Sequence, residues 1–285
     1  MSADIGCGAP QVNFYITLDG SRGFPKWDFH DKNILVSAGG LWSTQRGKFI
    51  RRKIPECRSF FLDSGGFGLC ARFGDYPFTV RQYAALIAHY LPKYAAVMDY
   101  ACEPDVSRTT LRTNKDRIDR TIEHTKELLG MDVGASTTII PVIQGFTESE
   151  YLYCIDQLEE NGLIRPYMAV GSMCRRTSIR DIQRMMQTVS GRVWTTHPEV
   201  RFHWFGLKLS ALQNFVCARY IHSCDSIAWK ISGDGKKYPS DETVLHGLLQ
   251  DYLRKVDSAV GAHAAQRGIE EYTIRRCCGA ASPHQ

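Results

Sequence analysis

Phe-Leu-Asp-Ser-Gly-Gly-Phe, at residues 61–67, is the stretch that decides the fold, because an apolar run ends there in a carboxylate, a hydroxyl and two glycines. The pattern predicts a buried strand whose C-terminal end opens into a turn with little side-chain bulk. Gly65 and Gly66 allow the backbone to approach a ligand closely, Asp63 supplies an acid/base group, and Phe67 offers a flat apolar face. Taken alone, a tight turn capped by Asp63 explains the stretch equally well.

The composition is that of an ordinary globular protein. The chain has 285 residues, of which 44% are hydrophobic and 23% are charged, so neither a disordered nor a fibrous class is indicated. No apolar run reaches the roughly 18 residues of a membrane span, and residues 1–10 lack the basic and apolar regions of a secretory signal. We therefore predict a cytoplasmic protein without a membrane partner, with its cysteines reduced.

The cysteines do not form a recognisable metal-binding motif. They are scattered along the chain without a CxxC pair, and several lie inside apolar segments, as buried thiols do. Only the adjacent Cys277 and Cys278, with His284, resemble a metal-binding group, and neighbouring cysteines rarely ligate one ion together. The sequence therefore predicts neither zinc nor another cofactor.

Basic side chains gather in loops that follow predicted strands. The formal net charge of +5 is modest, but Arg175 and Arg176 form one cluster, and Lys230, Lys236 and Lys237 form another. Basic loops at one end of a fold are the electrostatic footprint of a polyanion. We predict that these five side chains bind nucleic acid, although a solvated basic surface explains either cluster alone equally well.

Apolar runs alternate with amphipathic, helix-like segments along the chain. The predicted strands are Val12–Leu18, Ile34–Ala38, Phe60–Leu62, Ala95–Met98, Thr138–Ile143, Tyr167–Val170, Phe202–Leu207 and Ser223–Ala228. The predicted helices are Val80–Leu91, Leu111–Leu129, Glu148–Leu158, Ile179–Val189, Leu212–Ile221 and Glu242–Ala265. This alternation indicates that the strands are parallel.

Eight strands in a chain of this length predict an α/β fold of the (β/α)₈ TIM-barrel type, with a doubly wound open sheet as the alternative. The first two connections, residues 19–32 and 41–58, are rich in glycine, proline, aromatic or basic residues and are expected to be irregular insertions. No linker, repeat or low-complexity tract divides the chain. We therefore predict one domain over residues 1–275, followed by a disordered tail at 276–285.

Polar residues stand at the ends of several predicted strands, where the active site of such a barrel is expected. These positions hold Asp63 with Ser64, Asp99, Gln144 with Gly145, Gly171, and Asp225. Each has a structural explanation on its own, such as capping a loop or pairing with a lysine. Carboxylates at the ends of apolar strands are costly unless they are paired or used, so their joint occurrence favours a functional site.

The residue types favour one class of reaction. The chain has no Ser/His/Asp order, HExxH motif or P-loop. Two carboxylates facing one pocket suit glycosidic bond cleavage, in which one attacks the anomeric carbon and the other moves a proton. An aspartate, a glutamine amide and glycine N–H groups match the edge of a purine, on which Phe67 or Tyr100 would stack. We therefore predict an enzyme that breaks or exchanges an N-glycosidic bond in a polynucleotide.

These residues resemble, in order and spacing, the tRNA-guanine transglycosylase superfamily of (β/α)₈ barrels, which exchange guanine for a 7-deazaguanine base. The segments that carry the resemblance are Asp63–Phe67, Val142–Gly145, Ala169–Gly171 and Asp225. The resemblance implies that Asp225 is the nucleophile that forms a covalent intermediate and that Asp63 is the general acid/base. It further implies a base-binding set made of Ser64, Gly65, Gly66, Phe67, Asp99, Gln144, Gly145 and Gly171.

Two features distinguish the chain from the tRNA-modifying members of that superfamily. Those enzymes carry a CxCxxC…His zinc site after the last strand, whereas residues 231–266 contain no cysteine, and we see no appended RNA-binding domain. Both features, and the sequence Cys-Asp-Ser-Ile-Ala-Trp at 224–229, resemble the DpdA-type branch, which inserts 7-deazaguanines such as 7-cyano-7-deazaguanine (preQ0) into phage and bacterial DNA. The implied partners are DNA and a free 7-deazaguanine base. A tRNA substrate, a non-catalytic partner subunit and a hydrolase stay open as alternatives, and no oligomeric state is predicted.

Overall fold

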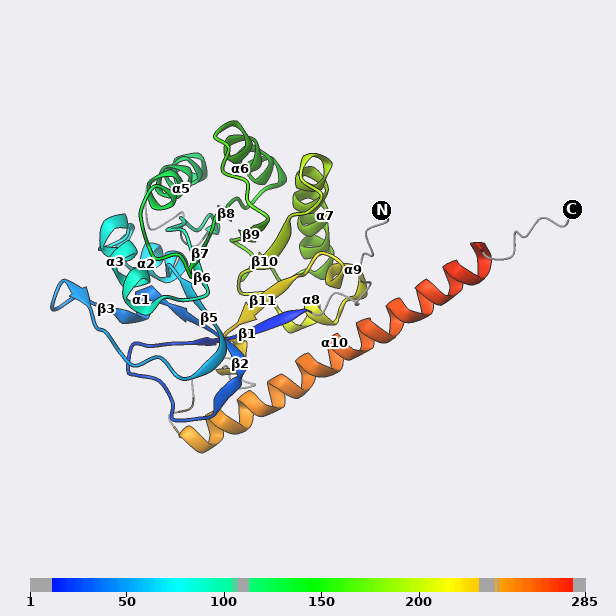
Figure 1. Cartoon of the computed structure of the whole chain (residues 1–285), viewed down its shortest axis with the longest axis horizontal. Helices are drawn as coiled ribbons and strands as arrows, with labels where there is room; N and C mark the ends of the chain where they lie inside the picture. The colour runs from blue at the N-terminus through cyan, green and yellow to red at the C-terminus, as the bar shows by residue number, and fades with distance from the viewer. Residues whose placement is uncertain (1–11, 105, 107–112, 231–238, 240, 279–285) are drawn as a thin grey trace, which may run out of the picture.

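Nine parallel strands form a nearly closed barrel in the computed structural model of the chain (Figure 1). The structure describes residues 12–104, 106, 113–230, 239 and 241–278, with side chains described as far as residue 266. The barrel strands are β1 (Asn13–Leu18), β2 (Phe29–Ser37), β5 (Cys57–Asp63), β6 (Tyr94–Ala96), β7 (Thr138–Ile140), β8 (Val142–Ile143), β9 (Tyr167–Val170), β10 (Arg201–Trp204) and β11 (Ser223–Ser226). The predicted α/β TIM-type barrel is confirmed.

The barrel is completed through a strand that proline divides in two. The sheet order is β7-β6-β5-β2-β1-β11-β10-β9-β8, so its first and last members are consecutive in sequence and separated only by Pro141. Proline has no N–H and interrupts a hydrogen-bond ladder. The carbonyl of Ile140 accepts from Val97 N at 3.1 Å, whereas that of Pro141 accepts from Ala169 N at 2.8 Å. The predicted strand Thr138–Ile143 therefore changes partners halfway along its length.

Helices surround the barrel and begin where the sequence supplies caps. The main ones are α3 (Val80–Tyr90), α5 (Asn114–Leu129), α6 (Glu148–Glu160) and α7 (Ile179–Thr196). In α3, α5 and α6 a threonine at the N-cap accepts a hydrogen bond from the third backbone N–H, and the side chain of that third residue bonds back to the N-cap. Each such capping box stabilises a helix start by about 1 kcal/mol.

The early connections and one later helix differ from regular βα units. Between β2 and β5 lie α1 (Ala38–Leu41) and a small antiparallel pair, β3 (Trp42–Ser43) with β4 (Lys48–Phe49). A helix that the sequence did not predict, α2 (Gly66–Phe73), follows β5. The predicted helix Leu212–Ile221 is two short helices, α8 (Leu209–Gln213) and α9 (Phe215–Ala218). They are separated at Asn214, whose side chain accepts from Cys217 N at 3.0 Å and caps the second helix.

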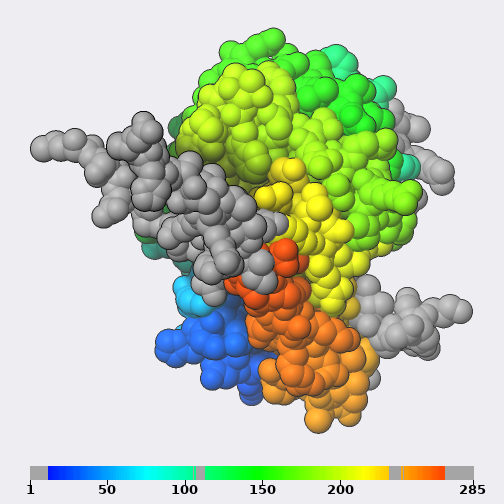
Figure 2. Space-filling model, turned by 90° about the vertical axis from the view of Figure 1, so that its right-hand side faces the viewer, coloured from blue at the N-terminus to red at the C-terminus, as the bar shows by residue number. Residues whose placement is uncertain are grey.

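The last helix, α10 (Glu242–Cys278), follows the short 3-10 turn η1 (Ala228–Lys230) and runs along the outside of the barrel (Figure 1). Its inner face buries Leu249, Val256 and Ala259. Figure 2 shows this helix, in orange, between the blue N-terminal segments and the yellow segments that precede η1. The helix passes the predicted end at Ala265 and includes residues 276–278, which the sequence assigned to a disordered tail. Residues 279–285 lie outside the described part.

No helix in the described residues is both long enough and apolar enough to cross a membrane. The cysteines whose side chains are described are free thiols, and most are buried.

Aromatic side chains fill the barrel interior below its mouth. Alternate residues of a strand point to one face, and the inward positions include Tyr15, Phe61, Tyr94, Tyr167 and His203. The ring of Phe61 lies 5.7 Å from that of Tyr15, 5.8 Å from that of Tyr94 and 4.8 Å from that of His203, measured between centroids. The alternation that turns Phe61 inward also turns Asp63, two residues later, toward the barrel mouth.

Candidate active site

The C-terminal ends of the strands carry the polar residues that the sequence singled out. Asp63 ends β5, Asp99 follows β6, Gln144 follows β8, Gly171 follows β9, and Asp225 lies in β11. Functional groups of (β/α)₈ barrels occupy this end of the fold. Gln144 lies in direct contact with Asp99 and next to Gly171. The charges of Asp99 and Asp225 also act on Asp63.

Asp63 is a half-buried carboxyl group with an unusual proton affinity. Burial raises its pKa to about 8, and the negative charges of Asp99 and Asp225 add to this effect. Hydrogen bonds from Gly65 N, 3.0 Å from Oδ2, and from the Ser37 side chain act in the opposite direction. A carboxyl group with this pKa carries a proton at neutral pH and can donate it.

Asp225 is 5% exposed and is fixed by two donors, one from β1 and one from the turn after β10. Thr17 Oγ1 donates to Oδ2 at 2.6 Å, and Gly206 N donates to Oδ1 at 2.8 Å. Oδ1 also lies 3.4 Å from Nε2 of His203. These contacts fix the plane of the carboxylate, which is the geometry that a nucleophilic carboxylate needs.

Asp99 and Gln144 form a second, deeper group. The Gln144 amide nitrogen donates to Asp99 Oδ2, and Ser64 Oγ donates to Asp99 Oδ1 at 2.8 Å. The other end of the Gln144 amide, Oε1, lies 2.7 Å from Ser172 Oγ. Burial raises the pKa of Asp99, while the hydrogen bonds from Ser64 and Gln144 lower it. The network fixes an acceptor edge and a donor edge side by side, as recognition of a purine requires.

The glycines of the predicted set provide space and backbone shape. Gly65 has a φ of +85° and forms the N-cap of α2, a conformation that side chains rarely adopt. A Cβ on Gly171 would lie 2.2 Å from Gln144 Nε2, and its N–H already donates to Ile143 O at 3.0 Å. Gly171 therefore contributes space rather than a donor. Gly66 and Gly145 also have no room for a side chain. A Cβ on Gly66 would lie 2.2 Å from Asp99 O, and a Cβ on Gly145 would lie 2.6 Å from Tyr151 N.

Phe67 and Arg175 lie next to each other although they come from different loops. Phe67 is the second residue of α2 and is partly buried, and the Arg175 guanidinium lies 5.4 Å from its ring centroid. Arg175 is exposed. The pair thus combines an aromatic face with a positive charge, which suits a base and its phosphate.

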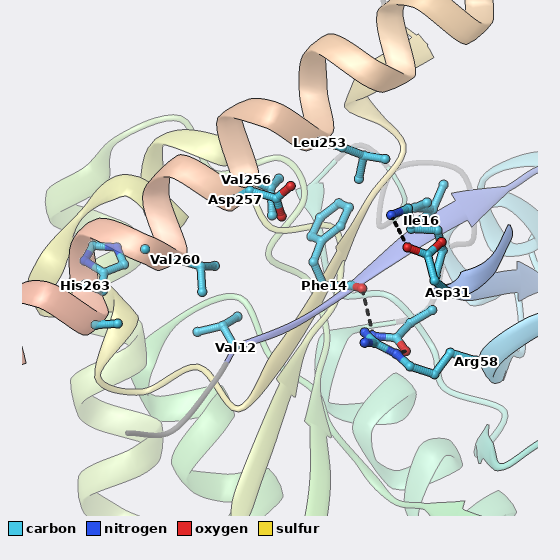
Figure 3. Close-up of a pocket in the computed structure, with 14 residues that line it drawn as sticks. Val12, Phe14, Ile16, Asp31, Arg58, Leu253, Val256, Asp257, Val260 and His263 are labelled. Carbon is cyan, nitrogen blue, oxygen red and sulfur yellow. Dashed lines mark hydrogen bonds and ion pairs between the residues drawn. The ribbon is translucent and has the colours of Figure 1, made fainter. Parts of the chain in front are cut away.

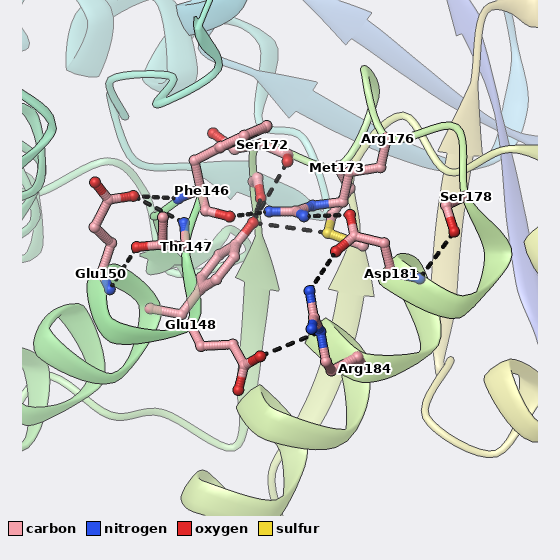
Figure 4. A network of polar contacts seen from close by, with 12 residues as sticks. Phe146, Thr147, Glu148, Glu150, Ser172, Met173, Arg176, Ser178, Asp181 and Arg184 are labelled. Atoms are coloured by element: carbon pink, nitrogen blue, oxygen red, sulfur yellow. Dashed lines mark hydrogen bonds and ion pairs between the residues drawn. The ribbon is translucent and has the colours of Figure 1, made fainter.

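Arg176 does not face solvent, contrary to its predicted role as a nucleic-acid contact (Figure 4). It is 5% exposed, its Nη1 lies 2.6 Å from Asp181 Oδ2, and its Nη2 donates to the carbonyl of Phe146. The guanidinium also lies over the Phe146 ring, 4.7 Å from its centroid. A guanidinium paired in this way stabilises the loop between β9 and α7, because removing either partner leaves a buried charge unpaired.

The second predicted basic cluster is described only in part. Lys230 ends η1, partly buried, with Nζ 5.2 Å from the ring centroid of Trp229. Burial lowers the pKa of Lys230. Lys236 and Lys237 lie outside the described residues.

No group of three or more His, Cys, Asp or Glu side chains suited to a metal ion occurs among the residues that the structure describes. The predicted weak grouping of Cys277 and Cys278 with His284 falls outside the described side chains, so the absence of zinc stays a prediction.

Several groups around the candidate site were not predicted from the sequence. Thr17 and Gly206 hold Asp225, but they belong to β1 and to the turn after β10, and neither residue type indicates a reactive group in the sequence. Ser172, with a φ of +56°, contacts both Gln144 and the buried Glu103. The signal that could have found Thr17 is strand alternation, because Tyr15 and Thr17 share the inward face.

A cavity of about 600 Å³ lies elsewhere, between the outer side of β1 and β2 and the helix α10 (Figure 3). Its lining includes Val12, Phe14, Val256 and Val260, and none of the predicted site residues. This cavity is therefore separate from the predicted site at the barrel mouth.

Comparison with known families agrees with the geometry of the mouth. The family model described as DpdA, DeoxyPurine in DNA protein A, matches residues 28–246, which is well over half of the chain. The match spans β2 to β11 and thus Asp63, Asp99, Gln144 and Asp225. No curated protein matches the sequence. From the family match it follows that the chain belongs to the DpdA family, DeoxyPurine in DNA protein A.

Proposed function

We propose that this chain replaces guanine in DNA with a 7-deazaguanine base, such as 7-cyano-7-deazaguanine, through a covalent intermediate on Asp225. Membership of the DpdA family supports the role of a DNA guanine/7-deazaguanine transglycosylase. The observation that carries the chemistry is the contrast between two neighbouring carboxyl groups. Asp63 has a pKa raised to about 8, whereas both oxygens of Asp225 accept hydrogen bonds. Such a contrast allows one group to act as an acid and the other as a nucleophile.

In the first half-reaction a carboxylate oxygen of Asp225 attacks C1′ of the target deoxyguanosine. The bond between C1′ and N9 breaks, and its electron pair stays on the departing guanine. Asp63 gives its proton to the guanine, which leaves as the neutral base, and the deoxyribose is held as an ester of Asp225.

In the second half-reaction the same groups work in reverse. Asp63, now ionised, takes the N9 proton of the incoming 7-deazaguanine, whose N9 attacks C1′ and displaces Asp225. Two displacements at one carbon retain the configuration of the nucleoside. A raised pKa suits this alternation, because a group that gives and takes protons works best when its pKa is near the operating pH.

Asp99 and Gln144 recognise the base through its hydrogen-bonding edge. The Asp99 carboxylate accepts from N1–H and the 2-amino group of guanine, and the free hydrogen of the Gln144 amide donates to O6. Guanine and 7-deazaguanines share this edge, whereas adenine would place a donor where Gln144 also donates. Phe67 stacks on the ring, a contact worth about 1–3 kcal/mol. The target base must leave the DNA helix to reach this depth, and Arg175 and Lys230 bind the flanking phosphates.

The test is an exchange assay with purified protein. The chain is incubated with labelled guanine or 7-cyano-7-deazaguanine and with either duplex DNA or tRNA, and the nucleosides are then analysed by mass spectrometry. We expect incorporation into DNA, and the Asp225→Ala variant is expected to lose it by more than about 1,000-fold. An aspartate-to-alanine change at exposed Asp257 serves as the matched control.

Three outcomes would overturn parts of the proposal. Undiminished exchange by the Asp225→Ala variant would show that Asp225 is not the nucleophile. Incorporation of the base into tRNA, with none into DNA, would show that the substrate is tRNA and not DNA. Release of free base without incorporation, at every concentration of 7-deazaguanine, would indicate a hydrolase, because water and the base compete for one intermediate.

A further inference from the structure

A histidine that the proposed mechanism does not use lies directly below the nucleophile. His203 is fully buried in the barrel interior, between the rings of Phe61 and Phe205, whose centroids are 4.8 and 4.7 Å from its own. The ring of Tyr15 closes a third side at 5.7 Å. An imidazole in such an apolar setting is costly unless its nitrogens are used.

Both nitrogens of His203 point at defined groups. Nδ1 lies 2.7 Å from Ser223 Oγ, and Nε2 lies 3.4 Å from Asp225 Oδ1. Within the described part of the chain, Nε2 has no hydrogen bond that meets ordinary geometric limits, and it faces the Asp225 carboxylate at that distance. Ser223 Oγ in turn lies 2.5 Å from the hydroxyl of Tyr167. A chain of polar atoms therefore leads from Tyr167 through Ser223 and His203 to the nucleophile.

The direction of this chain follows from what each group can donate. An ionised carboxylate only accepts, so the nitrogen that faces Asp225 carries the hydrogen. Nδ1 must then accept, which turns the hydroxyl hydrogen of Ser223 toward it and the hydroxyl hydrogen of Tyr167 toward Ser223. Burial raises the pKa of Tyr167, so this phenol keeps its proton. Every hydrogen in the chain points toward Asp225.

We propose that His203 is a positioning residue that stabilises the ionised form of the Asp225 nucleophile, with Ser223 and Tyr167 fixing its tautomer; this role rests on the proposed function. Asp225 loses its negative charge when it bonds to C1′ and regains it when the ester breaks. The positive end of an N–H dipole interacts more strongly with a charged oxygen than with a neutral one. Nε2–H therefore favours the step that releases Asp225, which is transfer of the deoxyribose to the incoming base.

The test uses two substitutions with different consequences for Nε2. His203→Phe keeps a ring in the aromatic box and removes the donor, and His203→Gln places an amide N–H near the position of Nε2. We expect His203→Phe to lower kcat by about 10- to 100-fold with KM for DNA changed less than about twofold. The covalent enzyme–DNA adduct should accumulate on denaturing gels above its wild-type amount. His203→Gln should restore part of kcat.

The control is Tyr15→Phe, which removes a buried hydroxyl from the same layer of the barrel. That hydroxyl bonds to Ser59, 3.2 Å away, and not to the chain of His203. Its kcat should therefore equal that of the wild type. A folded His203→Phe with wild-type kcat, with a change in KM alone, or without extra adduct would overturn the proposal.

A measurement on the wild-type protein keeps the proposal testable if the variants do not fold. Isotope-labelled histidine reports the tautomer by NMR, and His203 is expected to carry its hydrogen on Nε2, with the hydrogen moving toward Nδ1 in Ser223→Ala. A wild-type His203 with its hydrogen on Nδ1 would point a lone pair at Asp225 and refute the chain. This result does not depend on exchange activity, so a failure of the proposed function would be seen separately, as absence of incorporation by the wild type.

Discussion

Replacement of Asp63 by asparagine is expected to stabilise the protein at alkaline pH while abolishing exchange. The folded chain holds a proton on Asp63 up to a pKa of about 8, compared with 3.8 for an ordinary aspartate. Between these values the folded state binds a proton that the unfolded state releases. The free energy of unfolding therefore falls as pH rises through this window and becomes constant above it.

The size of the effect follows from the width of the window. Each pH unit corresponds to about 1.4 kcal/mol, so the window between 3.8 and about 8 gives an upper limit of ~6 kcal/mol. Because Asp63 is only half-buried and water screens part of its interactions, we expect about 2–3 kcal/mol near pH 8. An asparagine stays neutral at every pH and its oxygen can still accept from Gly65 N, so the variant avoids this loss.

The assay is urea unfolding followed by tryptophan fluorescence at several values between about pH 4.5 and pH 9. The wild type and Asp63→Asn should have similar stability at the acidic end and should diverge as pH rises, with the variant more stable. Asp257→Asn, which removes an exposed carboxylate from α10, should follow the wild type throughout. Parallel wild-type and Asp63→Asn curves, or a variant less stable at about pH 9, would refute the assignment of a raised pKa to Asp63.

Further predictions separate residues that look alike in sequence. Arg175→Ala should weaken DNA binding and lower the slope of log Kd against log salt by about 1, whereas Arg176→Ala should cost about 3 kcal/mol in urea unfolding and leave that slope unchanged. Gly171→Ala should lower kcat/KM for the incoming base at least about tenfold in the exchange assay, because its methyl group would displace the Gln144 amide. Gly191→Ala, where a Cβ meets nothing within 4 Å, should keep full activity; equal losses at Gly171 and Gly191 would contradict this reasoning.

The barrel could be predicted from the sequence because its strands are short apolar runs at regular intervals. Residues 138–143 read as one strand, and their division at Pro141 could not be foreseen, because it depends on which neighbour each carbonyl meets. The helix α2 was missed for a different reason. Its first three residues, Gly66, Phe67 and Gly68, have weak helix propensity, and only the barrel around them holds the turn in helical form.

The polar residues at the barrel mouth were predictable where strand ends carry charge. Asp63 was selected because it ends an apolar run, and Asp225 because the resemblance includes it, whereas Thr17 and His203 lie within runs that look like ordinary core. The sequence could not predict that Arg175 and Arg176 have different environments. Adjacent residues in the turn point in opposite directions, one toward solvent and the other toward Asp181, and only the fold distinguishes them.

The hydrogen bond from Thr17 to Asp225 joins residues 208 positions apart, in the first and last strands of the barrel. A contact of this separation forms late in folding, because the intervening chain must be ordered before the loop can close. During synthesis the first strand is complete long before the last one emerges. The nascent chain therefore carries the donor, Thr17, long before the carboxylate that it orients, Asp225. Recovery of exchange activity during refolding should coincide with final closure of the barrel and not with formation of its helices.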